Sequence, residues 1–195
     1  MCGFCGFINF QDNLGENLNR ENIQKMLNQI KFRGPDKSNT WNYKNKIFFG
    51  HNRLSILDLS DQGDQPMSSH DNKLVIVYNG EIYNHIELRK QIENIKKIEW
   101  RGTSDTETIL EYISIFGLQK SLESFRGMFS FALFDKKLNK LFLSKDSMGE
   151  KPLYYGYNSN LFYFGSDLRS FFASKNFTPE IDYSSLSLFF KYGFI

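Results

Sequence analysis

The chain has 195 residues and a formal net charge of +2, and 41% of its residues are hydrophobic. This length and composition suit one soluble globular domain with a sizeable core. The small net charge and the scattered basic residues argue against nucleic acid or a membrane surface as a partner. No apolar run approaches the roughly 20 residues of a membrane span, and the start lacks the pattern of a signal peptide. With only Cys2 and Cys5 as thiols, we expect a reducing, cytoplasmic location.

The first half of the chain predicts strands and helices in alternation. A strand from Phe4 to Phe10 ends at the turn cluster Gln11-Asp12-Asn13, and an amphipathic helix spans Asn22 to Lys31. Two β-rich runs at 46–50 and 73–78 predict further strands. Helices are expected at 85–93 and 106–116, the second ending at Gly117.

The second half predicts mainly hairpins. Strands are expected at 127–134, 140–145, 153–157 and 161–164, with turns at Asp135-Lys136-Lys137 and Asn158-Ser159-Asn160. Short helices are expected at 168–173 and 184–191. Many strands with short connections and a few helices indicate an α+β domain built on antiparallel sheets.

Cys2 is the first candidate for chemistry, because removal of Met1 would make it the N-terminal residue. An N-terminal cysteine combines a thiol nucleophile with an α-amino group, of reference pKa near 8, that can take the thiol proton. The alternative is that Cys2 is a small buried residue that opens the first strand.

Cys2 and Cys5 also form a C-x-x-C pair, which raises redox and zinc alternatives. A redox pair of the thioredoxin type follows a strand, and no strand precedes Cys2. A zinc site would need further ligands, and only His51, His70 and His85 could supply them, without metal-ligand spacing. Residues three apart on a strand face opposite sides, so the thiols should not converge. We therefore expect no metal site.

Polar residues in the connections could recognise an amino acid. Arg53 follows a strand and offers a guanidinium to a carboxylate. Asn79-Gly80 is typical of a type I′ hairpin turn. A side-chain amide beside an open backbone N–H also suits an oxyanion hole, and Glu81 adds an acceptor for an ammonium group.

Ser104-Asp105-Thr106-Glu107 has the pattern of a capping box at the start of a helix. It places the carboxylate of Asp105 in the first helical turn, where it could also hold an amine. Together the connections supply a thiol, an oxyanion site, a guanidinium and two carboxylates. This inventory fits hydrolysis of the side-chain amide of glutamine, among several other reactions.

The ordered motifs of the chain resemble those of glutamine-hydrolysing asparagine synthetases, over essentially the whole length. The motifs that carry the resemblance are Met1-Cys2-Gly3, Arg33-Gly34-Pro35-Asp36, Gly50-His51 with Arg53-Leu54-Ser55-Ile56, Gln65-Pro66-Met67, Asn79-Gly80-Glu81-Ile82-Tyr83-Asn84, Ser104-Asp105-Thr106-Glu107, Gly127-Met128-Phe129 and Gly149-Glu150-Lys151-Pro152-Leu153-Tyr154-Tyr155. The part that they resemble is the N-terminal glutaminase half, a class II glutamine amidotransferase of the N-terminal-nucleophile (Ntn) hydrolase type.

The resemblance implies a four-layer αββα sandwich of two antiparallel sheets flanked by helices. It implies that Cys2 is the nucleophile, with its own amine as base. Asn79 and the N–H of Gly80 would form the oxyanion hole. Arg53 would bind the α-carboxylate of L-glutamine, and Glu81 and Asp105 its ammonium group.

Arg33, by the same resemblance, would support the pocket without touching the substrate. In the family, hydrolysis gives glutamate and ammonia, and the ammonia amidates aspartate in a synthetase domain that uses ATP and magnesium. We expect residues 1–195 to be the glutaminase domain, with about 182–195 beginning a linker to that domain. No cofactor is expected in this chain, because ATP and magnesium belong to the missing domain.

The chain departs from the family in three ways. It ends at Ile195 without a pyrophosphate-binding Ser-Gly-Gly run, as a fragment or a split gene would. Lys145 and Ser147 stand where arginines are usual, which puts coupling to the synthetase in question. Cys5 replaces a small residue and could compete as a thiol.

Two alternatives stay open. The acceptor of ammonia could be another carboxylate, because relatives that amidate other acids share this half. The chain could also be a module that binds glutamine or a partner without turnover, which an intact Met1 would favour. The oligomeric state is open, with a homodimer as one alternative.

Overall fold

Two antiparallel sheets form the centre of the molecule in the computed structural model, which describes residues 1–10, 15–158 and 160–195. Sheet A has the strand order β2-β3-β1-β9-β8, and sheet B has the order β4-β5-β6-β7. The strands are β1 (Gly3–Asn9), β2 (Lys37–Tyr43), β3 (Ile47–Arg53), β4 (Met67–Ser68), β5 (Leu74–Ile82), β6 (Gly127–Asp135), β7 (Lys140–Lys145), β8 (Tyr154–Asn158) and β9 (Leu161–Gly165).

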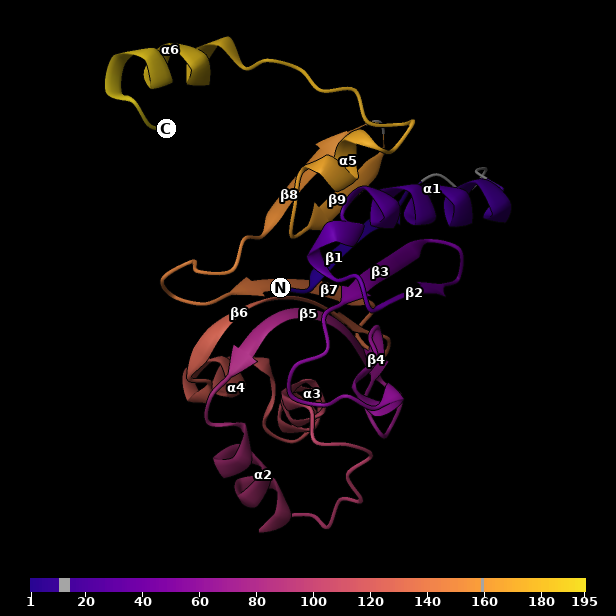
Figure 1. Ribbon diagram of the computed structural model, residues 1–195, viewed down its shortest axis with the longest axis vertical. Coiled ribbons are helices and arrows are strands. Elements are labelled where there is room, and N and C mark those ends of the chain that lie inside the picture. The colour runs from indigo at the N-terminus through magenta and orange to yellow at the C-terminus, as the bar shows by residue number, and fades with distance from the viewer. Residues whose placement is uncertain (11–14, 159) are drawn as a thin grey trace.

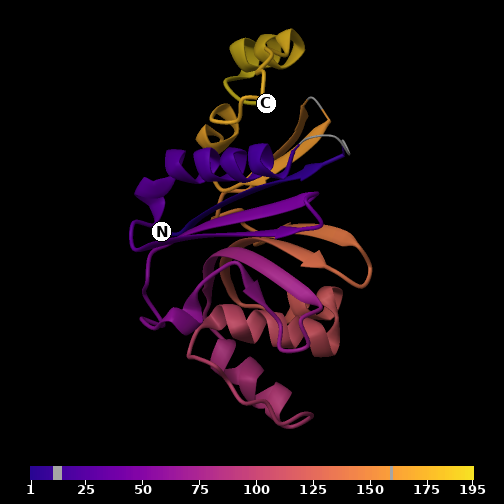
Figure 2. The same ribbon diagram turned by 90° about the vertical axis from the view of Figure 1, so that its right-hand side faces the viewer.

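Helices cover the outer face of each sheet (Figures 1 and 2). The helices are α1 (Glu16–Gln29), α2 (His85–Glu93), α3 (Asp105–Phe116), α4 (Leu118–Ser124), α5 (Arg169–Phe172) and α6 (Tyr183–Tyr192), with 3-10 turns η1 (Lys31–Arg33) and η2 (Asp61–Gly63). α1 and α5 pack on sheet A, and α3 packs on sheet B with α2 and α4 beside it. The layers therefore run helix, sheet, sheet, helix, which confirms the expected αββα sandwich.

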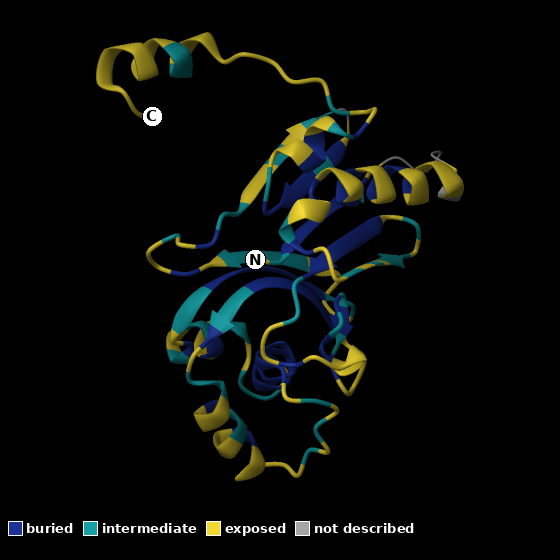
Figure 3. Cartoon of the chain, in the orientation of Figure 1, coloured by how far each residue is buried: buried dark blue, intermediate teal, exposed yellow. Residues whose placement is uncertain are grey.

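Three apolar clusters hold the layers together because the strands alternate in which face they present. Phe4 and Phe49 of sheet A meet Val77 and Phe134 of sheet B between the sheets. The opposite faces pack under the helices, as Phe7 does under α1. Figure 3 shows the buried strands between partly exposed helices.

The alternation of β1 decides where the two thiols lie. Cys5 packs with the α1 side of sheet A and is fully buried. Phe4 lies between the sheets, and Cys2, two residues earlier, lines a pocket on that side. The prediction that the two thiols face opposite sides is confirmed.

Several boundaries differ from those expected. β2, β4 and α4 are absent from the predicted elements, and α1 begins at Glu16 instead of Asn22. β2 is polar because it is an edge strand with one partner, β3, so its sequence shows no apolar run. The turn expected at Gln11-Asp12-Asn13 lies outside the described residues, as does part of the turn expected at 158–160.

Asn79-Gly80 does not form a hairpin turn. Both residues lie inside β5, which pairs with β6 in register from Leu74 with Asp135 to Ile82 with Gly127. The hairpin alternative is excluded because the chain continues in strand conformation through Ile82. Asn79 and Gly80 therefore lie on the open edge of β5, where they line a pocket.

Candidate active site

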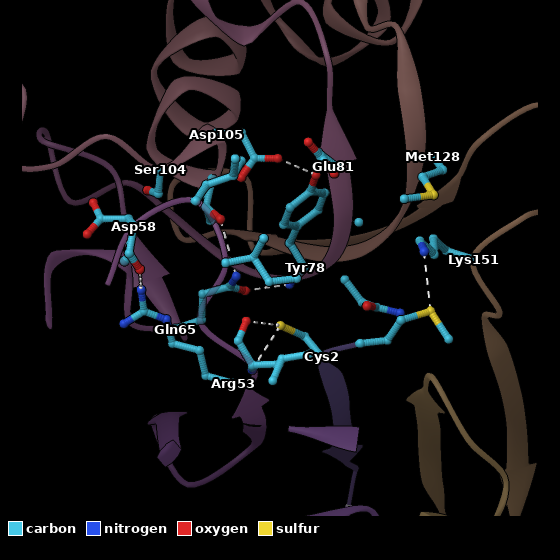
Figure 4. Close-up of a pocket in the computed structure, with 18 residues that line it drawn as sticks. Cys2, Arg53, Asp58, Gln65, Tyr78, Glu81, Ser104, Asp105, Met128 and Lys151 are labelled. Carbon is cyan, nitrogen blue, oxygen red and sulfur yellow. Dashed lines mark hydrogen bonds between the residues drawn. The ribbon is translucent and has the colours of Figure 1, made fainter. Parts of the chain in front are cut away.

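A cavity of about 130 Å³ opens where the ends of the two sheets meet the N-terminus (Figure 4). The residues predicted from the sequence all line it: Cys2, Arg53, Asn79, Gly80, Glu81 and Asp105. They come from the start of β1, the end of β3, the end of β5 and the first turn of α3. The fold thus brings together residues that lie up to 103 positions apart.

The Cys2 thiol is held against the chain that leaves β3. The N–H of Leu54 donates to Cys2 Sγ at 3.3 Å, and Sγ lies 3.5 Å from the Leu54 carbonyl oxygen. Burial raises the pKa of the Cys2 thiol, while the Leu54 backbone bond, the N-terminal charge and Arg53 act in the opposite direction. A thiol whose pKa is raised by burial needs a nearby base to become a nucleophile.

Arg33 contacts Cys2 from outside the cavity. Its Nε donates to the carbonyl oxygen of Cys2 at 3.2 Å, and its Nη1 lies 3.7 Å from Asp167. Arg33 does not line the pocket. This placement agrees with the predicted supporting role.

The open edge of β5 offers two hydrogen-bond donors to the pocket, the N–H of Gly80 and the side-chain Nδ2 of Asn79. The N–H of Tyr78 donates to Gln65 Oε1 at 2.6 Å, and that of Ile82 donates to Asp105 Oδ2 at 2.9 Å, both away from β6. Alternation along an antiparallel strand directs the N–H of Gly80 to the same edge. Within the described chain, Asn79 Nδ2 is buried and has no hydrogen-bond partner. Such an orphaned donor is costly unless a ligand satisfies it.

Asp105 is fixed at the acidic end of the pocket. Tyr78 Oη donates to Asp105 Oδ2 at 2.6 Å, in addition to the bond from Ile82. Burial raises the pKa of the Asp105 carboxyl, whereas these hydrogen bonds lower it. Ser104 Oγ accepts from the N–H of Glu107 at 3.4 Å, which confirms the predicted helix cap.

Arg53 is more restrained than the sequence suggested. Its Nη1 donates to the Ser60 carbonyl oxygen at 2.7 Å and to Asp64 Oδ1 at 2.8 Å, and its Nη2 donates to the Asp58 carbonyl oxygen. A guanidinium has five N–H donors, so two remain for a carboxylate in the pocket. The bonds to residues 58–64 fix the plane of the group.

Three lining residues were missed by the sequence interpretation. Gln65 joins the two walls, because it also donates through Nε2 to Thr106 Oγ1 at 3.2 Å. Tyr78 carries the hydroxyl that positions Asp105, and Lys151 brings an ammonium group to the opposite wall. Gln65 and Lys151 lie in motifs that the sequence interpretation had quoted, but nothing in a single sequence shows that they converge.

The described ranges contain no group of three or more side chains that could hold a metal ion. His51, His70 and His85, named in the zinc alternative, lie apart: His51 is buried between the sheets, and His70 bonds Glu107 at 2.9 Å. Among the helices that the structure describes, none is long and apolar enough to cross a membrane.

A family model described as the glutamine amidotransferase domain matches residues 1–195. The chain belongs to this family. It is 39% identical to a Methanocaldococcus jannaschii protein provisionally named as a glutamine-hydrolysing asparagine synthetase, covering 100% of this chain and 40% of that protein. It is 33% identical to asparagine synthetase 3 of Bacillus subtilis, covering 99% of this chain and 31% of that enzyme. The amidotransferase domain thus spans well under half the length of these relatives.

A solved structure shares the fold of this amidotransferase domain. The glutamine phosphoribosylpyrophosphate amidotransferase of B. subtilis superposes with a TM-score of 0.73 at 19% identity, over 88% of this chain and 43% of that one. At this identity the similarity concerns the fold alone. It agrees with the two-sheet architecture described above.

Proposed function

We propose that this amidotransferase domain hydrolyses L-glutamine to glutamate and ammonia, as the glutaminase part of an asparagine synthetase. The observation that carries the proposal is the orphaned Asn79 Nδ2 in the cavity that also contains the Cys2 thiol. A carbonyl oxygen placed between Asn79 Nδ2 and the N–H of Gly80 satisfies both donors. It also presents its carbon to the thiol, as an oxyanion hole requires.

The proposed reaction begins after Met1 is removed. The α-amine of Cys2 takes the thiol proton, and Sγ attacks the side-chain carbonyl carbon of glutamine. The tetrahedral intermediate places its oxyanion on Asn79 and Gly80 and then breaks its C–N bond. The nitrogen leaves as ammonia with the proton from the amine, and a thioester forms. Water attacks the thioester, and glutamate is released with the thiol restored.

Substrate recognition follows the polarity of the cavity. Glu81 and Asp105 line one end and suit the α-ammonium group of glutamine. The two remaining N–H donors of Arg53 suit its α-carboxylate. Pocket residues Leu54 and Met128 leave apolar surface for the methylene groups.

We extend the proposal to a synthetase partner that uses the ammonia with ATP and magnesium, in the same chain or a separate one. Support comes from the relatives, whose length exceeds the matched domain, and from surface left uncovered here. Tyr155 and Tyr157 of β8 are 69% and 64% exposed, and α6 contains no buried residue. We propose residues 182–195 as a linker and the cytoplasm as the location.

A paired substitution tests the glutaminase proposal. Cys2→Ala is expected to abolish glutamate release, because no thioester can form, while glutamine binding followed by calorimetry persists. Cys5→Ala is the matched control, since Cys5 is buried on the far side of sheet A, and it should retain activity. Intact mass must show Met1 removal in each sample. Equal glutamate release by the Cys2→Ala variant and the parent would refute the mechanism.

A further inference from the structure

Lys151 brings a buried positive charge to the wall of the pocket that also holds the N-terminus. The residue is 7% exposed, and its Nζ lies 3.3 Å from Met1 Sδ (dashed line in Figure 4). Within the part of the chain that the structure describes, no carboxylate oxygen lies within ion-pair distance of this ammonium group. A buried ammonium is costly without a partner, so its retention calls for a functional reason.

The backbone that carries Lys151 is firmly anchored. Asp146 Oδ2 accepts from the N–H groups of Lys151 and Phe129, each at 3.1 Å, and Asp146 Oδ1 accepts from Glu150 N at 2.9 Å. Asp146 N donates in turn to the Phe129 carbonyl oxygen at 2.8 Å. The loop after β7 is thereby tied to β6, and Lys151 is directed at the pocket.

The other charged side chains around the N-terminus either form an ion pair already or are placed to bind the charged groups of the proposed substrate. Arg33 of η1 is paired with Asp167, and Arg53 of β3 is paired with Asp64. Glu81 of β5 and Asp105 of α3 lie in the pocket, where the proposed substrate ammonium group would neutralise them. Among the described cations around the pocket, Lys151 is left without a counter-charge.

We propose that Lys151 is a positioning residue that lowers the pKa of the N-terminal amine and thiol of the processed chain. The inference rests on the proposed function. Removal of Met1 takes away the thioether that Lys151 contacts and creates a new α-amine at Cys2. A like charge disfavours protonation of that amine, and a cation favours the thiolate. The fraction of amine that is free to accept the thiol proton at neutral pH therefore rises.

The amine and the thiol titrate as a coupled pair, so the kinetics report macroscopic pKa values. Loss of the Lys151 charge raises both values. The acidic limb of kcat/KM is expected to move upward by about 0.5 to 1 pH unit. Below that limb, activity is proportional to the deprotonated fraction, so the shift corresponds to about a threefold to tenfold loss at pH 6.

The test compares the pH profiles of glutamate release in Lys151→Met, Lys151→Gln and Lys151→Arg. The neutral variants should show the shifted acidic limb with a plateau at high pH close to that of the parent. The arginine variant should keep the parental limb, because it keeps the charge. Lys140→Met is the matched control, since Lys140 is exposed at the far end of β7 and does not line the pocket.

A second measurement does not depend on turnover. The rate of Cys2 alkylation by iodoacetamide, followed against pH by peptide mass, should shift in the same direction in the neutral variants. An unshifted limb in these variants, or an equal shift in Lys151→Arg, overturns the proposal while leaving the glutaminase function intact. Failure of both neutral variants to fold overturns it too, because the charge would then serve the fold. A parent chain without glutaminase activity, despite Met1 removal, instead refutes the proposed function.

Discussion

At the scale of single residues, the site joins groups whose energetic costs are explained by a ligand. Asn79 Nδ2 is buried without a partner, and burial raises the pKa of both the Cys2 thiol and the Asp105 carboxyl. At neutral pH the unpaired amide of Asn79 and the buried carboxylate of Asp105 each cost folding free energy, and the Cys2 thiol is held in its unreactive, protonated form. Such residues cluster at functional sites, because selection for binding or catalysis retains them despite their cost in folding free energy.

Asn79→Ala tests whether this orphaned amide acts in the transition state. We expect kcat for glutamate release to fall about 10²- to 10³-fold with a small change in KM, as for other oxyanion donors. The thermal midpoint should not fall, because the lost Nδ2 makes no bond in the free protein. Asn28→Ala, on the exposed face of α1, is the matched control. An effect confined to KM would make Asn79 a binding residue instead.

At the scale of elements, one polar contact, made by a buried histidine, joins the two sheets beside the pocket. His51 of β3 lies 3.1 Å through Nε2 from the Tyr78 carbonyl oxygen of β5. Because a carbonyl oxygen can only accept, Nε2 carries a proton in this contact, while Nδ1 is buried without a hydrogen-bond partner. Burial lowers the pKa of His51 to about 4. This contact places β5, and with it Asn79, opposite Cys2.

The stability of this junction is expected to depend on pH. The unfolded chain protonates His51 near pH 6.5, whereas the folded chain does so only near 4. Between these values the unfolded state binds more protons, so stability falls as the pH falls through this window. At the acid end of this pH window, the free energy of unfolding has fallen by at most about 3 kcal/mol through His51.

Denaturant unfolding at pH 7 and at pH 4.5 measures this dependence. His51→Gln keeps an amide donor for the Tyr78 carbonyl but has no titrating group, so its stability should fall less over the same interval. Identical pH dependence in the variant and the parent would rule out His51 as the cause. Carboxylates that titrate below pH 5 are common to both proteins and cancel in the comparison.

At the scale of the whole molecule, the two sheets and their helices form one body, while α6 extends away from it (Figures 1 and 3). Every residue of α6 is exposed or only partly buried. The helix nonetheless has a cap, since Asp182 accepts from the N–H groups of Ser184 and Ser185 at 2.9 and 3.3 Å. A capped helix with exposed aromatic residues is suited to a partner surface.

Two phenylalanines distinguish the body from this extension. Phe171 of α5 is 2% exposed, so Phe171→Ala is expected to cost about 3 to 5 kcal/mol. Phe190 of α6 is 79% exposed, so Phe190→Ala should change stability by less than about 0.5 kcal/mol. Chemical denaturation measures both values. A large loss in Phe190→Ala would show that α6 packs on the body in solution.

Much of this protein follows from its sequence alone. β-rich runs separated by turn residues predicted β5, β6, β7 and β9, and the cap at Ser104 predicted the start of α3, because strand propensity, turns and capping act over short range. The ordered motifs identified the family, and the residues named for the site all line one cavity. The polar edge strand β2 and the strand conformation of Asn79-Gly80 escaped prediction, since pairing partners outweigh local preference there.

Only the tertiary structure decided how the site works as a unit. It showed that Arg53 is bound to the loop at 58–64, that Tyr78 and Gln65 fix the walls, and that Lys151 faces the N-terminus. These contacts join segments far apart in the chain, and their distances depend on how the two sheets pack. The sequence by itself named Cys2 and the other candidate residues of the site. Their burial, their orientation and the unmatched charge of Lys151 depend on long-range packing, which one sequence does not encode locally.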